Sequence, residues 1–153
     1  MLTQKKYKDK KTELSIREKL ALIRKKLKEC GIDAFLVPHN DMYFNEITAA
    51  FHNRLEWITG FTGSAGFAII FKDSAVIFTD GRYSIQIRQE VEQAFFTIEN
   101  ITKNSPYSWL QKNVKKKITV GFDPWLHSIK EIETQKKNLH KSIRLKEVNN
   151  LVD

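Results

Sequence analysis

The sequence has little cysteine and glycine, and it has no long apolar run. Its single cysteine, Cys30, excludes an internal disulfide and fits a reducing compartment. The longest strongly apolar run, residues 67–71, is far too short to cross a bilayer. The first residues lack the apolar core of a signal peptide. We therefore expect a cytoplasmic protein with no membrane partner.

Recognisable patterns for metal binding and nucleophilic catalysis are also missing. The four histidines fit no zinc-ligand spacing, and we expect each of them on a loop or at the surface. Residues 63–66 read Gly-Ser-Ala-Gly, which is not the Gly-x-Ser-x-Gly motif of serine hydrolases. The sequence therefore predicts no catalytic residue, metal site or cofactor in this chain. The four histidines are His39, His52, His127 and His140.

Three aspartates lie near the ends of expected strands and leave one alternative open. Asp33, Asp80 and Asp123 could together hold Mg²⁺ for phosphoryl chemistry. Asp80-Gly81 and Asp123-Pro124 are, however, ordinary turn pairs. A nuclease is therefore the weaker hypothesis.

The basic charge is concentrated near the N-terminus. The 153 residues carry a formal charge of +8. Residues 1–30 hold eleven Lys and Arg against four Asp and Glu, a charge of +7, which leaves +1 for the remaining 123 residues. Such a patch could attract nucleic acid, but only Tyr7 could stack on a base. We expect a disordered basic tail over residues 1–12, a solvated lysine face after it, and no nucleic-acid partner.

Apolar periodicity and turn residues predict one domain over residues 13–148. Strands alternate with helices and include one hairpin, which indicates an α/β fold with a mixed sheet. Residues 149–153 should begin a linker to a following domain. Capping boxes are expected at Ser15–Glu18 and Ser128–Glu131, and Ile129, Ile132 and Leu139 should point inward. The first expected helix follows Ser15, and Gly31 is the natural residue to end it. Further helices are expected over 82–93 and from 105 and 128, with a short helix or turn at 54–58. The expected strands span 33–37, 66–71, 74–79, 95–99, 118–120 and 143–145.

The stretch from Arg54 to Tyr83 holds four of the six glycines, at positions 60, 63, 66 and 81. Glycine suits positive φ or the close approach of another group, so we expect a loop beside a sheet edge. At least one of the first three glycines should have positive φ. Trp57 and Phe61 should pack beside this loop, and Trp57 is the better candidate for exposure at its rim. A glycine-rich turn with no ligand is the alternative.

The motifs in this stretch resemble a known family. Residues 54–66 read Arg-x-x-Trp-x-x-Gly-Phe-x-Gly-Ser-Ala-Gly, and residues 79–83 read Thr-Asp-Gly-Arg-Tyr. This order resembles the creatinase/prolidase N-terminal domain of Xaa-Pro aminopeptidases (aminopeptidase P). Further matches lie at 33–38, 120–128 and 150–153. The resemblance implies a three-layer, ribonuclease H-like fold with helices on both faces of the sheet.

The resemblance also implies a function. The family removes an N-terminal residue that precedes proline, and its catalytic domain holds two divalent metals, usually manganese. That domain comes later in the protein, and in the long form of the family the domain next to this one is a second copy of the same fold. The chain should therefore be the non-catalytic first domain of a long, multi-domain enzyme, and inactive alone. It would shape the entrance for Xaa-Pro peptides and contribute to subunit assembly, including a homo-oligomer. The alternative is a stand-alone binding or assembly module.

Four residues are candidates for substrate contact. The arginine of the Thr-Asp-Gly-Arg-Tyr motif reaches towards the peptide in the family, which makes Arg82 the first candidate. Trp57, Arg54 and Tyr83 are secondary candidates. The structural alternative for Arg82 is a salt bridge with Asp80 or Glu56, or a cap on the following helix.

Overall fold

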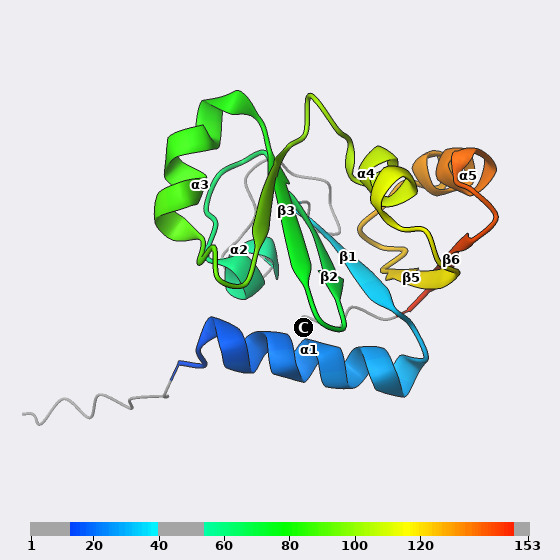
Figure 1. Ribbon diagram of the computed structural model, residues 1–153, viewed down its shortest axis with the longest axis horizontal. Coiled ribbons are helices and arrows are strands. Elements are labelled where there is room, and N and C mark those ends of the chain that lie inside the picture. The colour runs from blue at the N-terminus through cyan, green and yellow to red at the C-terminus, as the bar shows by residue number, and fades with distance from the viewer. Residues whose placement is uncertain (1–12, 40–53, 149–153) are drawn as a thin grey trace, which may run out of the picture.

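The computed structural model describes residues 13–39 and 54–148. The expectations for the tail at 1–12, for His52 and for the linker at 149–153 lie outside the described residues. In chain order the elements are α1 (Ile16–Cys30), β1 (Ala34–Pro38), α2 (Arg54–Thr59), β2 (Phe67–Phe71), β3 (Ala75–Thr79), the 3₁₀ helix η2 (Gly81–Tyr83), α3 (Ser84–Glu90), β4 (Thr97–Asn100), α4 (Pro106–Asn113), β5 (Ile118–Phe122), α5 (Ile129–Asn138) and β6 (Ile143–Glu147) (Figure 1).

The strands form one mixed sheet in the order β4-β3-β2-β1-β5-β6. β2 runs antiparallel to both of its neighbours, whereas the other pairs are parallel, so the predicted hairpin is confirmed. The register places Phe67 opposite Pro38 on one side and opposite Phe78 on the other. The start of β2 thus lies beside the ends of β1 and β3. We call this edge of the sheet, where the parallel strands end, the carboxyl edge.

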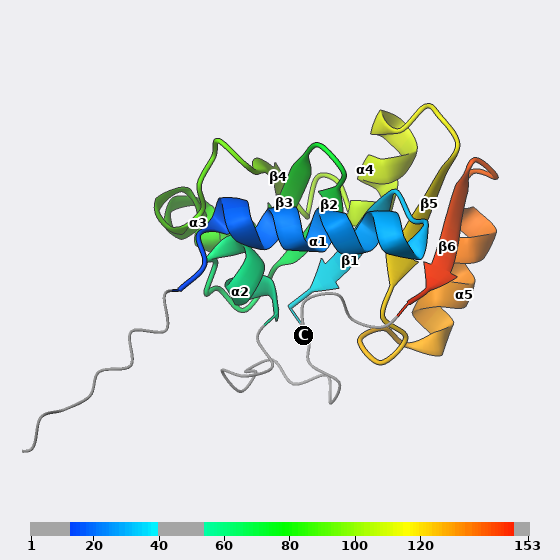
Figure 2. The same cartoon turned by 90° about the horizontal axis from the view of Figure 1, so that it is seen from below.

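Helices cover both faces of the sheet. Figures 1 and 2 show α1 lying across one face, with α2 on the same side, while α4 and α5 lie on the other. Successive strand residues point alternately to the two faces, as the period of two in a strand requires. The predicted three-layer α/β fold is therefore confirmed. The first face buries Phe35, Val37, Ala68, Ile70 and Ile77 with α1, α2 and α3, and the second buries Leu36, Phe67, Ile69, Val76 and Phe78 with α4 and α5.

Helix α1 begins and ends as its sequence predicts. The Ser15 hydroxyl accepts a hydrogen bond from the backbone of Glu18, and the Glu18 carboxylate accepts one from the backbone of Ser15 at 2.7 Å. This capping box satisfies two backbone donors that the first turn leaves without partners. Gly31 ends the helix with a φ of 66°. The apolar stripe of α1 packs against the sheet. The expectation of a solvated lysine face holds only in part, because Lys19 is buried and Arg24 Nε donates a hydrogen bond to the Phe71 carbonyl at 2.9 Å.

The start of α5 differs from the prediction. Ser128 caps the helix, but the Glu131 side chain turns to Tyr107 and His127 and does not complete a capping box. Ile129 is also not inward, because its residue is 78% exposed. It is the first residue of a helix that begins at the carboxyl edge (Figure 2), where the buried core beneath the helix ends.

Two further elements differ from the prediction only in where they begin or end. The helix expected over 82–93 is divided into η2 and α3 and ends at Glu90. The strand expected over 95–99 is β4, which begins at Thr97 because pairing with β3 starts there.

Three of the histidines lie on loops, as expected, but two of these are buried. His39 and His127 lie in the core, whereas His140 is exposed. The His127 ring makes edge contacts with the rings of Phe67 and Phe122. Its Nδ1 lies 3.5 Å from the Glu131 carboxylate. A polar partner inside an apolar setting is what permits this burial.

The Glu131 carboxylate gives the fold a pH-dependent contribution. The hydrogen bond with His127, assisted by one that the Tyr107 hydroxyl donates at 3.0 Å, holds the pKa of Glu131 below its usual range. A lowered pKa means that the stabilisation is present above the unfolded value, about 4.3, and is lost as the pH falls through the lower folded value. Glu131→Gln should therefore cost roughly 0.5–1 kcal/mol at pH 6, a figure reduced for solvent screening. Urea unfolding at pH 6 and pH 3 checks this: the cost should shrink at pH 3, and an equal cost at both would contradict it.

Candidate functional site

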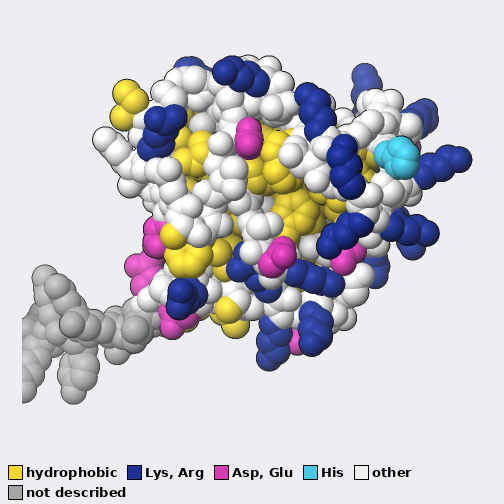
Figure 3. Space-filling model, in the orientation of Figure 1, with side chains coloured by type: hydrophobic (Ala, Val, Ile, Leu, Met, Phe, Trp, Pro, Cys, Tyr) yellow, Lys and Arg dark blue, Asp and Glu magenta, His cyan; other side chains and the backbone are white. Residues whose placement is uncertain are grey.

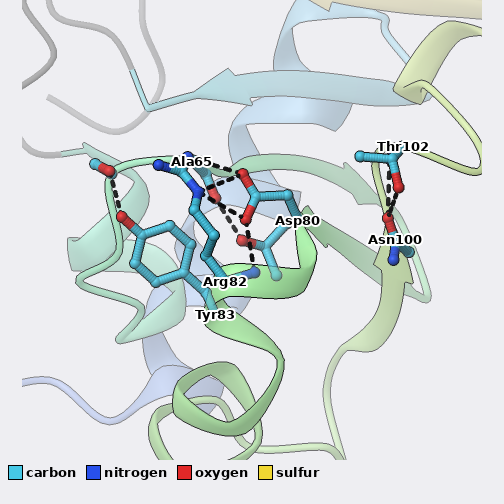
Figure 4. A network of polar contacts seen from close by, with 8 residues as sticks. Ala65, Asp80, Arg82, Tyr83, Asn100 and Thr102 are labelled. Carbon is cyan, nitrogen blue, oxygen red and sulfur yellow. Dashed lines mark hydrogen bonds and ion pairs between the residues drawn. The ribbon is translucent and has the colours of Figure 1, made fainter.

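The glycine-rich stretch and the Thr-Asp-Gly-Arg-Tyr motif meet at the carboxyl edge. Residues 60–66 lead into β2, and η2 follows β3, its hairpin partner. The Thr79 hydroxyl, on the last residue of β3, donates a hydrogen bond to the Ala65 carbonyl (Figure 4). Open α/β sheets bind ligands outside the carboxyl ends of their strands. This edge is therefore the candidate functional site.

The loop needs three of its glycines, for two different reasons. Gly60 has a φ of 79°, which confirms that at least one has positive φ. A Cβ added there would lie 3.0 Å from the backbone oxygen of Glu90. At Gly63 a Cβ would lie 2.3 Å from the Phe61 ring, and at Gly66 2.6 Å from the Leu55 side chain. Gly81, by contrast, has open space around it.

Helix α3 holds this loop in place. The backbone and hydroxyl of Thr62 donate hydrogen bonds to the Glu90 carboxylate at 2.9 and 2.6 Å. Gln86 donates to the Thr62 hydroxyl at 2.9 Å. Glu90 and Gln86 are one helical turn apart, so both side chains can form hydrogen bonds with the same loop residue. The loop and the element that follows η2 thus form one unit.

Phe61 is a core residue, whereas Tyr83 links the core to the site. The two rings meet edge to face with centroids 5.8 Å apart. The Tyr83 hydroxyl forms a short hydrogen bond with the Ser64 hydroxyl (Figure 4). This bond joins η2 to the glycine-rich loop.

The other two candidates, on α2, lie differently. Arg54 is buried in the first turn of the helix. Trp57 is half-buried, as expected for the more exposed aromatic of the pair. The ammonium of Lys19 in α1 lies over its ring, 5.1 Å from the centroid. Of the four candidates, the structure directly joins Arg82 and Tyr83, whose guanidinium carbon and ring centroid are 5.3 Å apart.

Asp80 orients the Arg82 side chain. Its carboxylate accepts hydrogen bonds from Arg82 Nε at 3.1 Å and Nη2 at 2.8 Å, and from the Arg82 backbone at 3.0 Å (Figure 4). These hydrogen bonds hold the pKa of Asp80 below its usual range. The ion pair with Asp80 that we kept as an alternative therefore exists. It nevertheless leaves the Arg82 side chain 66% exposed at the edge of the sheet, where it can meet a second acceptor.

The three aspartates considered for Mg²⁺ do not come together. Asp33 lies at the opposite edge, where it accepts hydrogen bonds from the Thr119 backbone at 2.8 Å and from Lys72 at 3.2 Å. Asp123 accepts from the backbone of Trp125. Two strands separate Asp80 from Asp123, which places them roughly 14 Å apart. In residues 13–39 and 54–148, no three or more His, Cys, Asp or Glu side chains form a group that could hold a metal.

The charge is distributed differently from the prediction. Residues 31–102 are acidic, and residues 103–153 hold eleven Lys and Arg against five Asp and Glu, a charge of +6. Basic side chains gather on the side that carries α5 and β6 (Figure 3). They surround a groove of about 830 Å³ at the edge opposite the site. Counting charge by thirds of the sequence would have found this second basic surface, whose cations are Lys117, Lys136, Lys137, Lys141 and Arg144.

Within the described ranges, no helix has the length and apolar character needed to span a membrane.

Comparison with known proteins identifies the family to which this chain belongs. The model of the creatinase/prolidase N-terminal domain matches residues 19–153. Aminopeptidase P2 of Arabidopsis thaliana is 35% identical over 150 residues, and Xaa-Pro aminopeptidase 2 of Rattus norvegicus is 31% identical over 144. Each match covers 93% of this chain but 21% of the relative, so the chain spans about a fifth of these proteins.

Two solved structures have the same fold. The X-prolyl aminopeptidase of Caenorhabditis elegans, a cytosolic enzyme with a di-nuclear active site, superposes with a TM-score of 0.81 at 24% identity, over 92% of this chain and 25% of that one. The N-terminal, creatinase/prolidase-like domain of a protein from Corynebacterium diphtheriae gives a TM-score of 0.66 at 29% identity, over 88% of this chain and 96% of that one. This chain belongs to the creatinase/prolidase N-terminal domain family, and its relatives are Xaa-Pro aminopeptidases.

Proposed function

We propose that this chain is the non-catalytic N-terminal domain of a longer, cytoplasmic Xaa-Pro aminopeptidase. Its relatives carry that activity in their names, and about four-fifths of their length lies outside the match. The described residues do not fit a metal centre. The two divalent metals of the family, manganese in our proposal, would therefore be held by the following part of the protein, where they would activate water.

The single observation that supports a role in substrate binding is the position of Arg82. Its guanidinium is largely exposed at the carboxyl edge, and Asp80 fixes its direction. A guanidinium can donate two parallel hydrogen bonds to a carbonyl or carboxylate. An Xaa-Pro-Xaa peptide presents such groups beyond its proline. The carboxyl edge would then form one wall of the substrate entrance, and the domain would also contribute to assembly of a homo-oligomer.

Photo-cross-linking tests this role. The longer product of the same locus is incubated with an Xaa-Pro-Xaa peptide that carries a photoreactive group after the proline. We expect cross-links in residues 80–83, located by mass spectrometry and removed by an excess of unlabelled peptide. Specific cross-links confined to other parts of the protein would contradict the role of the carboxyl edge.

A stand-alone binding or assembly module is the second candidate. The Corynebacterium diphtheriae structure is compatible with it, because that N-terminal domain was solved by itself and the match covers 96% of its chain. A fold of this kind therefore forms without further domains. The reading frame downstream of Asp153 separates the two candidates, because the first requires the metal ligands there.

A further inference from the structure

Two large apolar side chains project from the connection between β5 and α5. Trp125 is 73% exposed and Ile129 is 78% exposed. Together with Pro124 we call them the Trp125 surface. Exposed aromatic side chains of this size are typical of binding surfaces, where they act as anchors.

The exposure of Trp125 is imposed by its neighbours. The Asp123 carboxylate accepts a hydrogen bond from the Trp125 backbone at 2.9 Å, and the Asp123 carbonyl accepts one from Leu126 at 3.0 Å. Leu126 and His127, the next two residues, are buried. The connection is thus fixed on both sides of Trp125, so its ring is held outward.

A small cavity lies beside this surface. Its volume is about 160 Å³, and Phe122, Pro124, His127 and Ile129 contribute to its lining. His127 Nε2 is buried and has no hydrogen-bond partner among the described residues. Burying a polar atom without a hydrogen-bond partner is unfavourable. Because His127 lines the cavity, a polar group that entered the cavity would lie beside this ring.

The end of β6 lies beside the same cavity. Glu147, the last residue of β6, lines the same cavity. The Val148 backbone donates a hydrogen bond to the Phe122 carbonyl at 3.0 Å. Figure 2 shows the end of β6 beside the β5–α5 connection, at the carboxyl edge. Val148, the last residue that the structure describes, therefore lies next to the Trp125 surface.

We propose that the Trp125 surface docks the domain that follows this one in the longer protein, an inference that rests on the proposed function. The docked domain presents an apolar patch to Trp125 and Ile129 and one polar group to the cavity beside His127. Docking here fixes the carboxyl edge, and with it Arg82, relative to the catalytic part. Trp is among the residues that contribute most to binding when they lie at the centre of such a contact.

Hydroxyl-radical footprinting tests the docking directly, because it measures the exposure of side chains. The 153-residue chain and the longer product of the locus are oxidised under equal conditions. We expect oxidation of Trp125 to be at least fivefold slower in the longer protein. Ile85 on α3, which is 74% exposed, is the internal control and should react equally in both.

A variant and an activity assay separate the possible failures. Trp125→Ala in the longer protein should increase the oxidation of Ile129, whereas Ile85→Ala should leave it unchanged. A longer protein that cleaves Xaa-Pro peptides but leaves Trp125 as reactive as in the short chain would overturn the docking and leave the proposed function standing. Protection of Trp125 without cleavage would support docking and count against the function. Concentration-dependent protection in the short chain would instead assign the surface to a second copy and overturn the inference.

Discussion

Replacing Arg82 with alanine in the longer protein should raise KM for Xaa-Pro-Xaa peptides roughly ten- to hundredfold, with little change in kcat. The estimate comes from hydrogen bonds to a charged group, which contribute about 1.5–3 kcal/mol, and from about 1.4 kcal/mol per factor of ten. Arg82 is exposed beside Asp80, and the part of the chain that the structure describes holds no cluster of side chains around it that could bind a metal. It should therefore position the peptide without taking part in the chemical step. Steady-state kinetics with a tripeptide series measures both constants.

Matched variants give this prediction its specificity. Arg82→Lys keeps the charge but loses the planar fork, so it should recover only part of the affinity. Arg88→Ala removes another exposed guanidinium from the same segment and should have little effect. If Arg82→Ala leaves kcat/KM unchanged, or if Arg88→Ala has an equal effect, the Asp80–Arg82 pair is a structural cap on η2.

Replacing Gly60 with valine should destabilise the domain by roughly 2–4 kcal/mol. A positive φ costs a residue with a Cβ about 1–2 kcal/mol, and overpacking adds about 1–3. Gly60 has a φ of 79°, and a Cβ would meet the backbone oxygen of Glu90 at 3.0 Å. Backbone cannot turn away as a flexible side chain can, so α3 would have to move. Thermal unfolding should show a Tm lower by about 5–15 °C.

Gly81→Ala is the matched control for Gly60→Val. Its Cβ would meet no atom within 4 Å, and its φ is not positive. The substitution should leave Tm within about 2 °C, as expected for surface changes of less than about 0.5 kcal/mol. Equal losses in the two variants would mean that conformational freedom of the segment, and not the geometry at Gly60, sets the cost.

Local patterns in the sequence predicted most of the fold. The capping box at Ser15, the left-handed Gly31 and the hairpin of β2 and β3 all depend on residues close together in the chain. Such interactions can be predicted from the sequence because the geometry of the helix or strand fixes the spacing of the residues involved. The motif at Thr79–Tyr83 likewise predicted the position of Arg82 after a strand. Its pairing with Asp80, two residues away, was recognised as an alternative.

The features that the sequence did not predict depend on contacts between distant elements. Glu131 matches the capping-box spacing, but Tyr107 of α4 supplies its side chain with another hydrogen-bond partner. His127 is buried because Phe67 and Phe122, on two different strands, cover its ring. Ile129 fits the apolar spacing of α5, yet it lies where the underlying core has ended. In each case the sheet order, and not the local sequence, decides the environment.

A peptide-cleavage assay of the short chain and the longer product of its locus tests the central claim most directly. Both proteins are given an Xaa-Pro peptide with manganese, and release of the first residue is measured with and without a chelator. The account predicts metal-dependent release by the longer protein and none by the 153-residue chain. Manganese-stimulated release by the pure short chain, or a longer product with no metal-dependent activity, would contradict it.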